Sequence, residues 1–131
     1  MSEKSRFLTE LEAIPTRETD GGRTIWKLTQ DLAFFYAPRH ETFVAPKGFE
    51  SDFASIPRVP FIYLVMNDRG HKAAVIHDRL CRDGRIPREL ADKVFRAALR
   101  AEGVSAWRAW LMYRAVRLAG AKPASTWEMM E

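Results

Sequence analysis

The chain has few of the features that stabilise small proteins by means other than packing. It contains a single cysteine, Cys81, among 131 residues, so it cannot form an internal disulfide, and no Cys/His cluster has the spacing of a structural zinc site. No apolar run reaches the roughly 18 residues of a membrane-spanning helix, and the N-terminus, MSEKSRFLTELEA, lacks the apolar stretch of a signal peptide. We therefore expect a protein without a transmembrane segment, made in a reducing cytoplasm.

Acidic residues are scarce in the C-terminal half. The net charge of the whole chain is +4, but residues 68–120 carry 12 basic and 6 acidic groups. The arginines of this half alternate with apolar residues at helical spacing, which favours a solvated helix face over a nucleic-acid or anionic-surface interface. We do not expect a nucleic-acid partner.

The first half of the chain is rich in patterns typical of β-strands. Residues 7–12 alternate imperfectly, 24–28 alternate well, 31–37 contain three consecutive aromatic residues, and 42–45 form a fourth candidate. Turn residues separate these segments, among them the Gly pair at 21–22 and the Pro-Lys-Gly at 46–48. The pattern predicts an antiparallel β-meander.

The second half changes to a helical period. Apolar positions predict helices over 72–82, 88–101 and 105–119, with Gly84 and Pro87 between the first two and Ser105 as the N-cap of the third. The sequence thus predicts an α+β fold in which the meander packs against a bundle of about three helices. We expect one domain over 1–131, with strands and turns over about 6–57, helices over 58–120 and a tail over 121–131.

Two ionisable residues are predicted to meet between the first two helices. His77 is about six residues before the turn and Asp92 about five after it, so in an antiparallel hairpin they differ by only about 2 Å in height. The carboxylate would then fix the tautomer of the imidazole. A buried His–Asp bond of this kind is either a structural link between helices or a catalytic dyad, with His77 as base and Asp92 as its partner.

Two further carboxylates are candidate metal ligands. Asp78 is rotated away from His77 toward Arg82, so it either holds a divalent cation (Ca, Mg or Zn) or forms an ion pair with Arg82. Asp52 lies in the segment GFESDFASIP, where it either forms a turn or faces the same cleft as His77.

Other residues are interpreted as structural. Cys81 lies four residues after His77, but a lone cysteine in an apolar stripe is usually a small core residue, so a zinc half-site or nucleophile is the minor alternative. Trp107 and Trp110 are expected in the core, with a partner interface as the alternative. His40 and His71 are expected at the surface.

The motifs together resemble a known family. The stretches GFESDFASIPR, AAVIHD, ADKVF and AWRAWLMYRAVR are similar to those of uncharacterised proteins common in tailed bacteriophages and prophages, over roughly residues 30–120. This resemblance implies a phage origin and no particular activity. It would place the protein in the host cytoplasm when made, or incorporated in the virion with other phage structural proteins as partners.

The site alone has a second similarity, to the dyad of secreted phospholipase A2 enzymes. By that resemblance His77 would activate water, Asp78 would bind calcium and Asp92 would orient His77. The chain departs from these enzymes at Cys81, where they usually have tyrosine, and it lacks their glycine-rich calcium loop and disulfides. Two hypotheses follow: a small hydrolase acting on a cell-envelope substrate such as a lipid or peptidoglycan ester or amide, or a non-enzymatic tail, baseplate or other virion component.

Overall fold

The strands precede the helices, as an α+β fold requires. The computed structural model describes residues 4–18, 22, 24–51 and 70–121. Within these residues the strands are β1 (Arg6–Phe7), β2 (Ala13–Glu18), β3 (Thr24–Leu28), β4 (Leu32–Tyr36), β5 (Glu41–Ala45) and β6 (Glu50–Ser51), and the helices are the single turn η1 (Ala37–Arg39), α2 (His71–Asp83), α3 (Arg88–Ala101) and α4 (Ala106–Ala121). The predicted class is confirmed.

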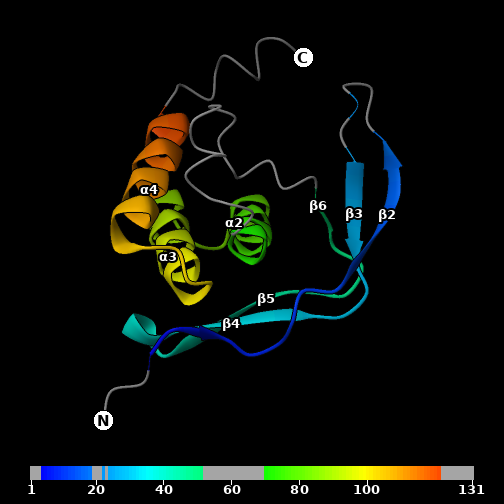
Figure 1. Ribbon diagram of the computed structural model, residues 1–131, viewed down its shortest axis with the longest axis horizontal. Helices are drawn as coiled ribbons and strands as arrows, with labels where there is room; N and C mark the ends of the chain where they lie inside the picture. Colours follow the sequence, from blue (N-terminus) through cyan, green and yellow to red (C-terminus); the bar gives the residue numbers. More distant parts are fainter. Residues whose placement is uncertain (1–3, 19–21, 23, 52–69, 122–131) are drawn as a thin grey trace.

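The strands form two small antiparallel sheets, a division that the sequence did not indicate. One sheet has the order β1-β4-β5 and the other has the order β2-β3-β6. The helices lie against the first sheet, while the second stands to the side of them (Figure 1). The first sheet therefore provides the floor on which α2 and α3 are placed.

The missed strand β2 has an unusual sequence for a strand, AIPTRE. Its pairing with β3 shifts register between Pro15 and Arg17, and such a bulge tolerates a residue that cannot donate a ladder hydrogen bond. The strand expected over 7–12 was wrong beyond Phe7, because β1 ends there.

The helices match the predicted ranges to within two residues. Gly84 ends α2 in the left-handed conformation, with φ of 70°, which a residue without a Cβ adopts at little cost. Ser105 directly precedes α4 as expected, but its buried hydroxyl makes no hydrogen bond, so the predicted side-chain cap does not form.

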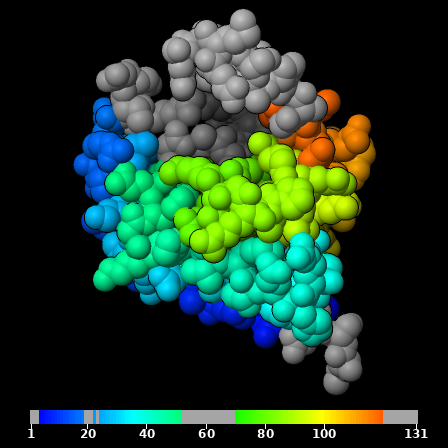
Figure 2. Space-filling view, turned by 180° about the vertical axis from the view of Figure 1, so that it is seen from behind, coloured from blue at the N-terminus to red at the C-terminus, as the bar shows by residue number. Residues whose placement is uncertain are grey.

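The core lies between the first sheet and the three helices. Its largest fully buried apolar side chains are Leu32, Phe34, Val75, Ile76, Val94, Phe95, Leu99 and Met112. From behind, α2 and the start of α3 form a band across the molecule, with residues of η1 and β5 below it (Figure 2). The described helices include none that is long and apolar enough to cross a membrane.

The two tryptophans of α4 are on the surface. Trp107 is 56% exposed and Trp110 is 47% exposed, so the core position expected for them was wrong. Ala109, Met112 and Val116 provide the buried side of α4 instead. His40 and His71 are exposed, as expected.

Candidate functional site

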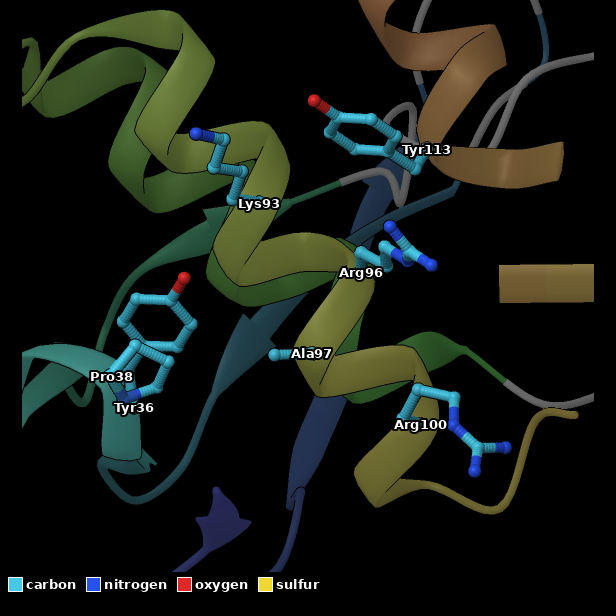
Figure 3. A pocket seen from close by; sticks show the side chains of 7 residues that line it. All are labelled: Tyr36, Pro38, Lys93, Arg96, Ala97, Arg100 and Tyr113. Atoms are coloured by element: carbon cyan, nitrogen blue, oxygen red, sulfur yellow. The ribbon is translucent and has the colours of Figure 1, made fainter. Parts of the chain in front are cut away.

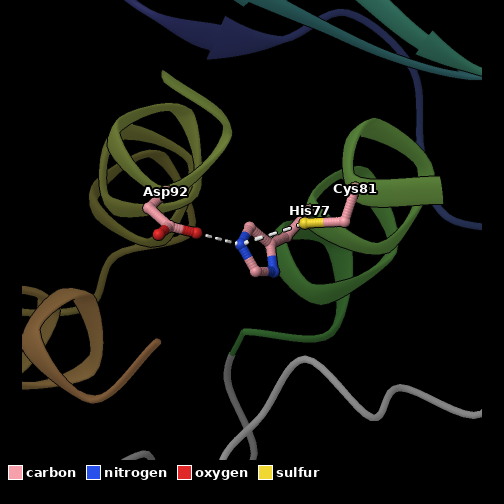
Figure 4. A group of neighbouring side chains, drawn as sticks. All are labelled: His77, Cys81 and Asp92. Carbon is pink, nitrogen blue, oxygen red and sulfur yellow. Dashed lines mark hydrogen bonds and ion pairs between the residues drawn. The ribbon is translucent and has the colours of Figure 1, made fainter. Parts of the chain in front are cut away.

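The predicted His–Asp pair is present at the contact between α2 and α3. His77 Nε2 lies 2.5 Å from Asp92 Oδ1, and the two side chains point toward each other from facing helices (Figure 4). Both are buried, with 2% of His77 and 0% of Asp92 exposed. The apolar period of α2 turns His77 inward together with Ala73, Ile76 and Leu80, which is why the sequence could predict this contact.

Asp92 also binds two arginines that were not predicted. Arg88 Nε donates to Oδ1 over 2.9 Å, and Arg117 Nη1 donates to Oδ2 over 3.0 Å. Because Arg117 lies on α4, the carboxylate joins all three helices. Arg88 is four residues before Asp92 on one helix, a spacing that signals an ion pair, but no sequence signal indicates a partner 25 residues away.

These partners decide the charge of Asp92. Burial alone would raise the pKa of this carboxyl, but the hydrogen bonds from His77 and Arg88 and the positive charge of Arg88 outweigh burial and hold the pKa below its usual value. Asp92 is therefore an ionised acceptor. A buried carboxylate with three donors has its charge compensated, as the cost of burying it requires.

The two ring nitrogens of His77 have different surroundings. Since ionised Asp92 can only accept, Nε2 carries the hydrogen, and Nδ1 of the neutral ring is an acceptor. Nδ1 is buried and has no hydrogen-bond partner in the described part of the chain. The ring packs against Phe95, with ring centroids 4.8 Å apart, so its orientation is fixed by packing as well as by Asp92.

Cys81 contacts the same edge of the imidazole. Its Sγ lies 3.6 Å from His77 Nε2, and burial raises the pKa of the thiol to about 11. A neutral thiol of this kind agrees with the expected small core residue. Among the described residues, ligand atoms of His77, Cys81 and Asp92 lie within 4.8 Å of one another, so this group could hold a metal ion.

The predicted metal ligands are not part of this group. Both oxygens of Asp78 accept from Arg82, over 2.8 Å and 2.6 Å, which is the ion pair that the sequence offered as the alternative to a cation. Asp52 lies outside the described residues.

Glu102 is a second partly buried carboxylate that the sequence did not single out. Its oxygens accept from the backbone N–H groups of Ala73, over 2.6 Å, and Gly70, over 3.2 Å. It therefore caps the N-terminus of α2 from the residue that follows α3, where the helix dipole favours a negative charge. Burial outweighs these bonds and raises the pKa of Glu102.

Comparison with known proteins gives one finding. A family model described as a protein of unknown function (DUF1353) matches residues 26–116. No curated protein and no solved structure matches the chain. The matched stretch includes His77, Cys81, Arg88 and Asp92.

Proposed function

This chain belongs to the DUF1353 family, whose function is unknown, and we propose that it is a small hydrolase. In this proposal His77 is the general base and Asp92 holds it in place. The observation that carries the proposal is the buried Nδ1 of His77, which lacks a hydrogen-bond partner among the described residues. An unsatisfied buried polar atom costs about 1–3 kcal/mol. A purely structural bond to Asp92 uses Nε2 and gives no reason to leave Nδ1 without a partner.

In this proposal Nδ1 takes a proton from a water molecule. The water oxygen forms a bond to the carbonyl carbon of an ester or amide, and the proton passes from Nδ1 to the leaving oxygen or nitrogen as that bond breaks. The imidazole carries a positive charge in between, which the Asp92 carboxylate stabilises from 2.5 Å away. Since only 2% of the His77 side chain is exposed, water fits this role better than direct attack by the ring.

The setting is taken from the sequence motifs, and the substrate class is part of the proposal. The resemblance to tailed-phage proteins supports a phage-encoded protein made in the host cytoplasm. The proposed substrate is a lipid or peptidoglycan ester or amide of the cell envelope. A cation is an optional part of the proposal. His77, Cys81 and Asp92 offer nitrogen, sulfur and oxygen, a donor set that suits zinc, but zinc at Nε2 would replace the hydrogen that Asp92 accepts. Asp78 could bind calcium or magnesium only by releasing Arg82.

The test uses two substitutions that each retain one end of the imidazole. His77→Gln places an amide nitrogen near the position of Nε2 and can still donate to Asp92, but it removes Nδ1. His77→Asn retains a polar atom near Nδ1 and loses the bond to Asp92. We expect His77→Gln to melt near the wild-type temperature and to lose turnover of phospholipid vesicles or purified peptidoglycan, measured as released fatty acid or new amino groups. Turnover that survives in His77→Gln would refute the proposal.

A second candidate is a non-enzymatic virion or tail assembly component. It is favoured by the sharing of Asp92 between His77 and two arginines on two helices, because these bonds connect α2, α3 and α4 as a purely structural carboxylate would. The exposed Trp107 and Trp110 would then contact a phage structural protein. Stoichiometric recovery of the protein with purified phage particles, together with no turnover by the wild type, would favour this candidate.

A further inference from the structure

A cavity on the other side of α3 is lined by positive charge. Its volume is about 330 Å³, and it is lined by Tyr36, Pro38, Lys93, Arg96, Ala97, Arg100 and Tyr113. Figure 3 shows Tyr36 and Pro38 on one side of α3 and Tyr113, from α4, on the other. Neither His77 nor Asp92 lines it, so its role is independent of the function proposed above.

The cations form a row along one helix. Lys93, Arg96 and Arg100 are spaced i, i+3 and i+7, so they share one face over roughly 10 Å of helix. No carboxylate of the described residues lines the cavity. Like charges at this spacing destabilise a helix unless an anion compensates them, and the only acidic partner among the described residues is Glu89, 3.5 Å from the mostly exposed Lys93.

Two of the cations are held in place before any ligand arrives. The Arg96 guanidinium lies 5.8 Å from the ring centroid of Tyr113, and it makes no hydrogen bond or ion pair with another described residue. Arg100 Nη1 donates to the backbone oxygen of Val104 over 2.8 Å, which leaves its other N–H groups for a ligand. Side chains ordered in this way lose less entropy on binding than free ones.

The rest of the lining is suited to an organic group. Ala97 has a short side chain between Lys93 and Arg100, and Pro38 and the ring of Tyr36 lie opposite it. A second cavity shares Pro38, Ala97 and Arg100 with the first and adds Lys4. The positive surface is thus continuous and has apolar contacts within it.

We propose that this cavity binds a phosphate monoester of a small organic molecule. The phosphoryl oxygens would accept from Arg96 and Arg100, whose planar N–H forks match their geometry, and Lys93 would add charge. The organic part would lie over Ala97, against Tyr36. A small-molecule ligand is favoured over a polymer because the open hollow of about 330 Å³ has the size of a typical ligand pocket.

The experiment titrates the full chain with phenyl phosphate by calorimetry. We expect one saturable site, with weaker binding of glycerol phosphate, which has no ring to contact Ala97 and Tyr36. Arg96→Gln should weaken phenyl phosphate about tenfold, as the loss of one charge-assisted hydrogen bond predicts. Arg96→Lys should recover part of this loss, because it retains the charge without the fork.

The matched control is Lys27→Gln, which removes one exposed cation from β3 in the other sheet. We expect it to change the affinity by less than about twofold, since a distant exposed charge is screened. Equal weakening by Lys27→Gln and Arg96→Gln would overturn the proposal, as would equal affinity for benzoate or the absence of saturable binding. An oligonucleotide that binds while phenyl phosphate does not would overturn the assignment of a small ligand.

Discussion

The two ends of α3 each have a carboxylate that connects this helix to α2, but the two carboxylates have different partners. Asp92, near the start, accepts from the side chains of His77, Arg88 and Arg117. Glu102, just after the end, accepts from backbone N–H groups at the start of α2. The pKa of Asp92 is lowered and the pKa of Glu102 is raised, although burial acts in the same direction on both.

The difference shows that charged donors can outweigh the burial of an acid, as at Asp92, whereas the partners of Glu102 do not outweigh its burial. Charged donors at hydrogen-bond distance compensate the carboxylate of Asp92, whereas the backbone N–H groups and the charge of Lys72 around Glu102 compensate less than its burial costs. The same reasoning applies to the exposed face of α3, where Lys93, Arg96 and Arg100 have little acidic compensation. A helix can thus have a compensated site on one face and an uncompensated one on another.

The largest expected effect is on stability and comes from Asp92→Asn. In this variant the amide has only one acceptor oxygen for Arg88 and Arg117, and the negative charge that compensates the two arginines is gone. The free energy of unfolding should therefore fall by about 3–5 kcal/mol. Urea unfolding followed by circular dichroism measures it. A loss below about 1 kcal/mol would mean that the charge of Asp92 is not needed by its three partners.

A smaller loss is expected for Glu102→Gln. The amide keeps one acceptor oxygen, but its NH2 group is brought toward the N–H of Ala73 or Gly70, so one backbone donor of α2 loses its partner. This should cost about 1–2 kcal/mol. Hydrogen exchange of the first turn of α2 should accelerate in this variant and stay unchanged in the last turn. Uniform acceleration along α2 would contradict the assignment of Glu102 as a cap.

The pH dependence of the two sites should have opposite signs. The stabilisation from Asp92 is present above its ordinary pKa of 3.8 and is lost as the pH falls through its lowered folded value. The contribution of Glu102 is fully present below its ordinary pKa of 4.5 and is lost as the pH rises through its raised folded value. The free energy of unfolding of the wild type minus that of Glu102→Gln should therefore increase from pH 7 to pH 4. The same difference for Asp92→Asn should decrease below pH 4. Two differences that change in the same direction as the pH falls would contradict the comparison.

The parts of this structure that sequence could predict are those set by local period. The three helices, the strand at 24–28 and the meeting of His77 with Asp92 follow from apolar spacing and the short turn at Gly84. The division into two sheets, the contact of Arg117 with Asp92 and the cap by Glu102 depend on pairings between distant segments, which no local pattern encodes. The core position predicted for Trp107 and Trp110 was wrong because the spacing of apolar residues places them together on one face of α4, whereas the packing of the helix decides which face is buried.

The smallest effect is expected for Asp78→Asn, the same chemical change as Asp92→Asn one residue from His77. Asp78, whose side chain is 15% exposed, pairs with Arg82, whose side chain is 51% exposed, and pairs four residues apart on a helix surface contribute about 0.3–0.5 kcal/mol. The loss should be of that size and should fall further in 1 M salt, where the pair is screened.

If Asp78 held calcium as the phospholipase-like arrangement requires, calcium would raise the melting temperature of the wild type and not of Asp78→Asn. Since Arg82 already occupies both oxygens, we expect calcium to leave both melting temperatures unchanged. A calcium-dependent difference between the two proteins would instead show that Arg82 yields its place and that the site next to His77 is a metal site.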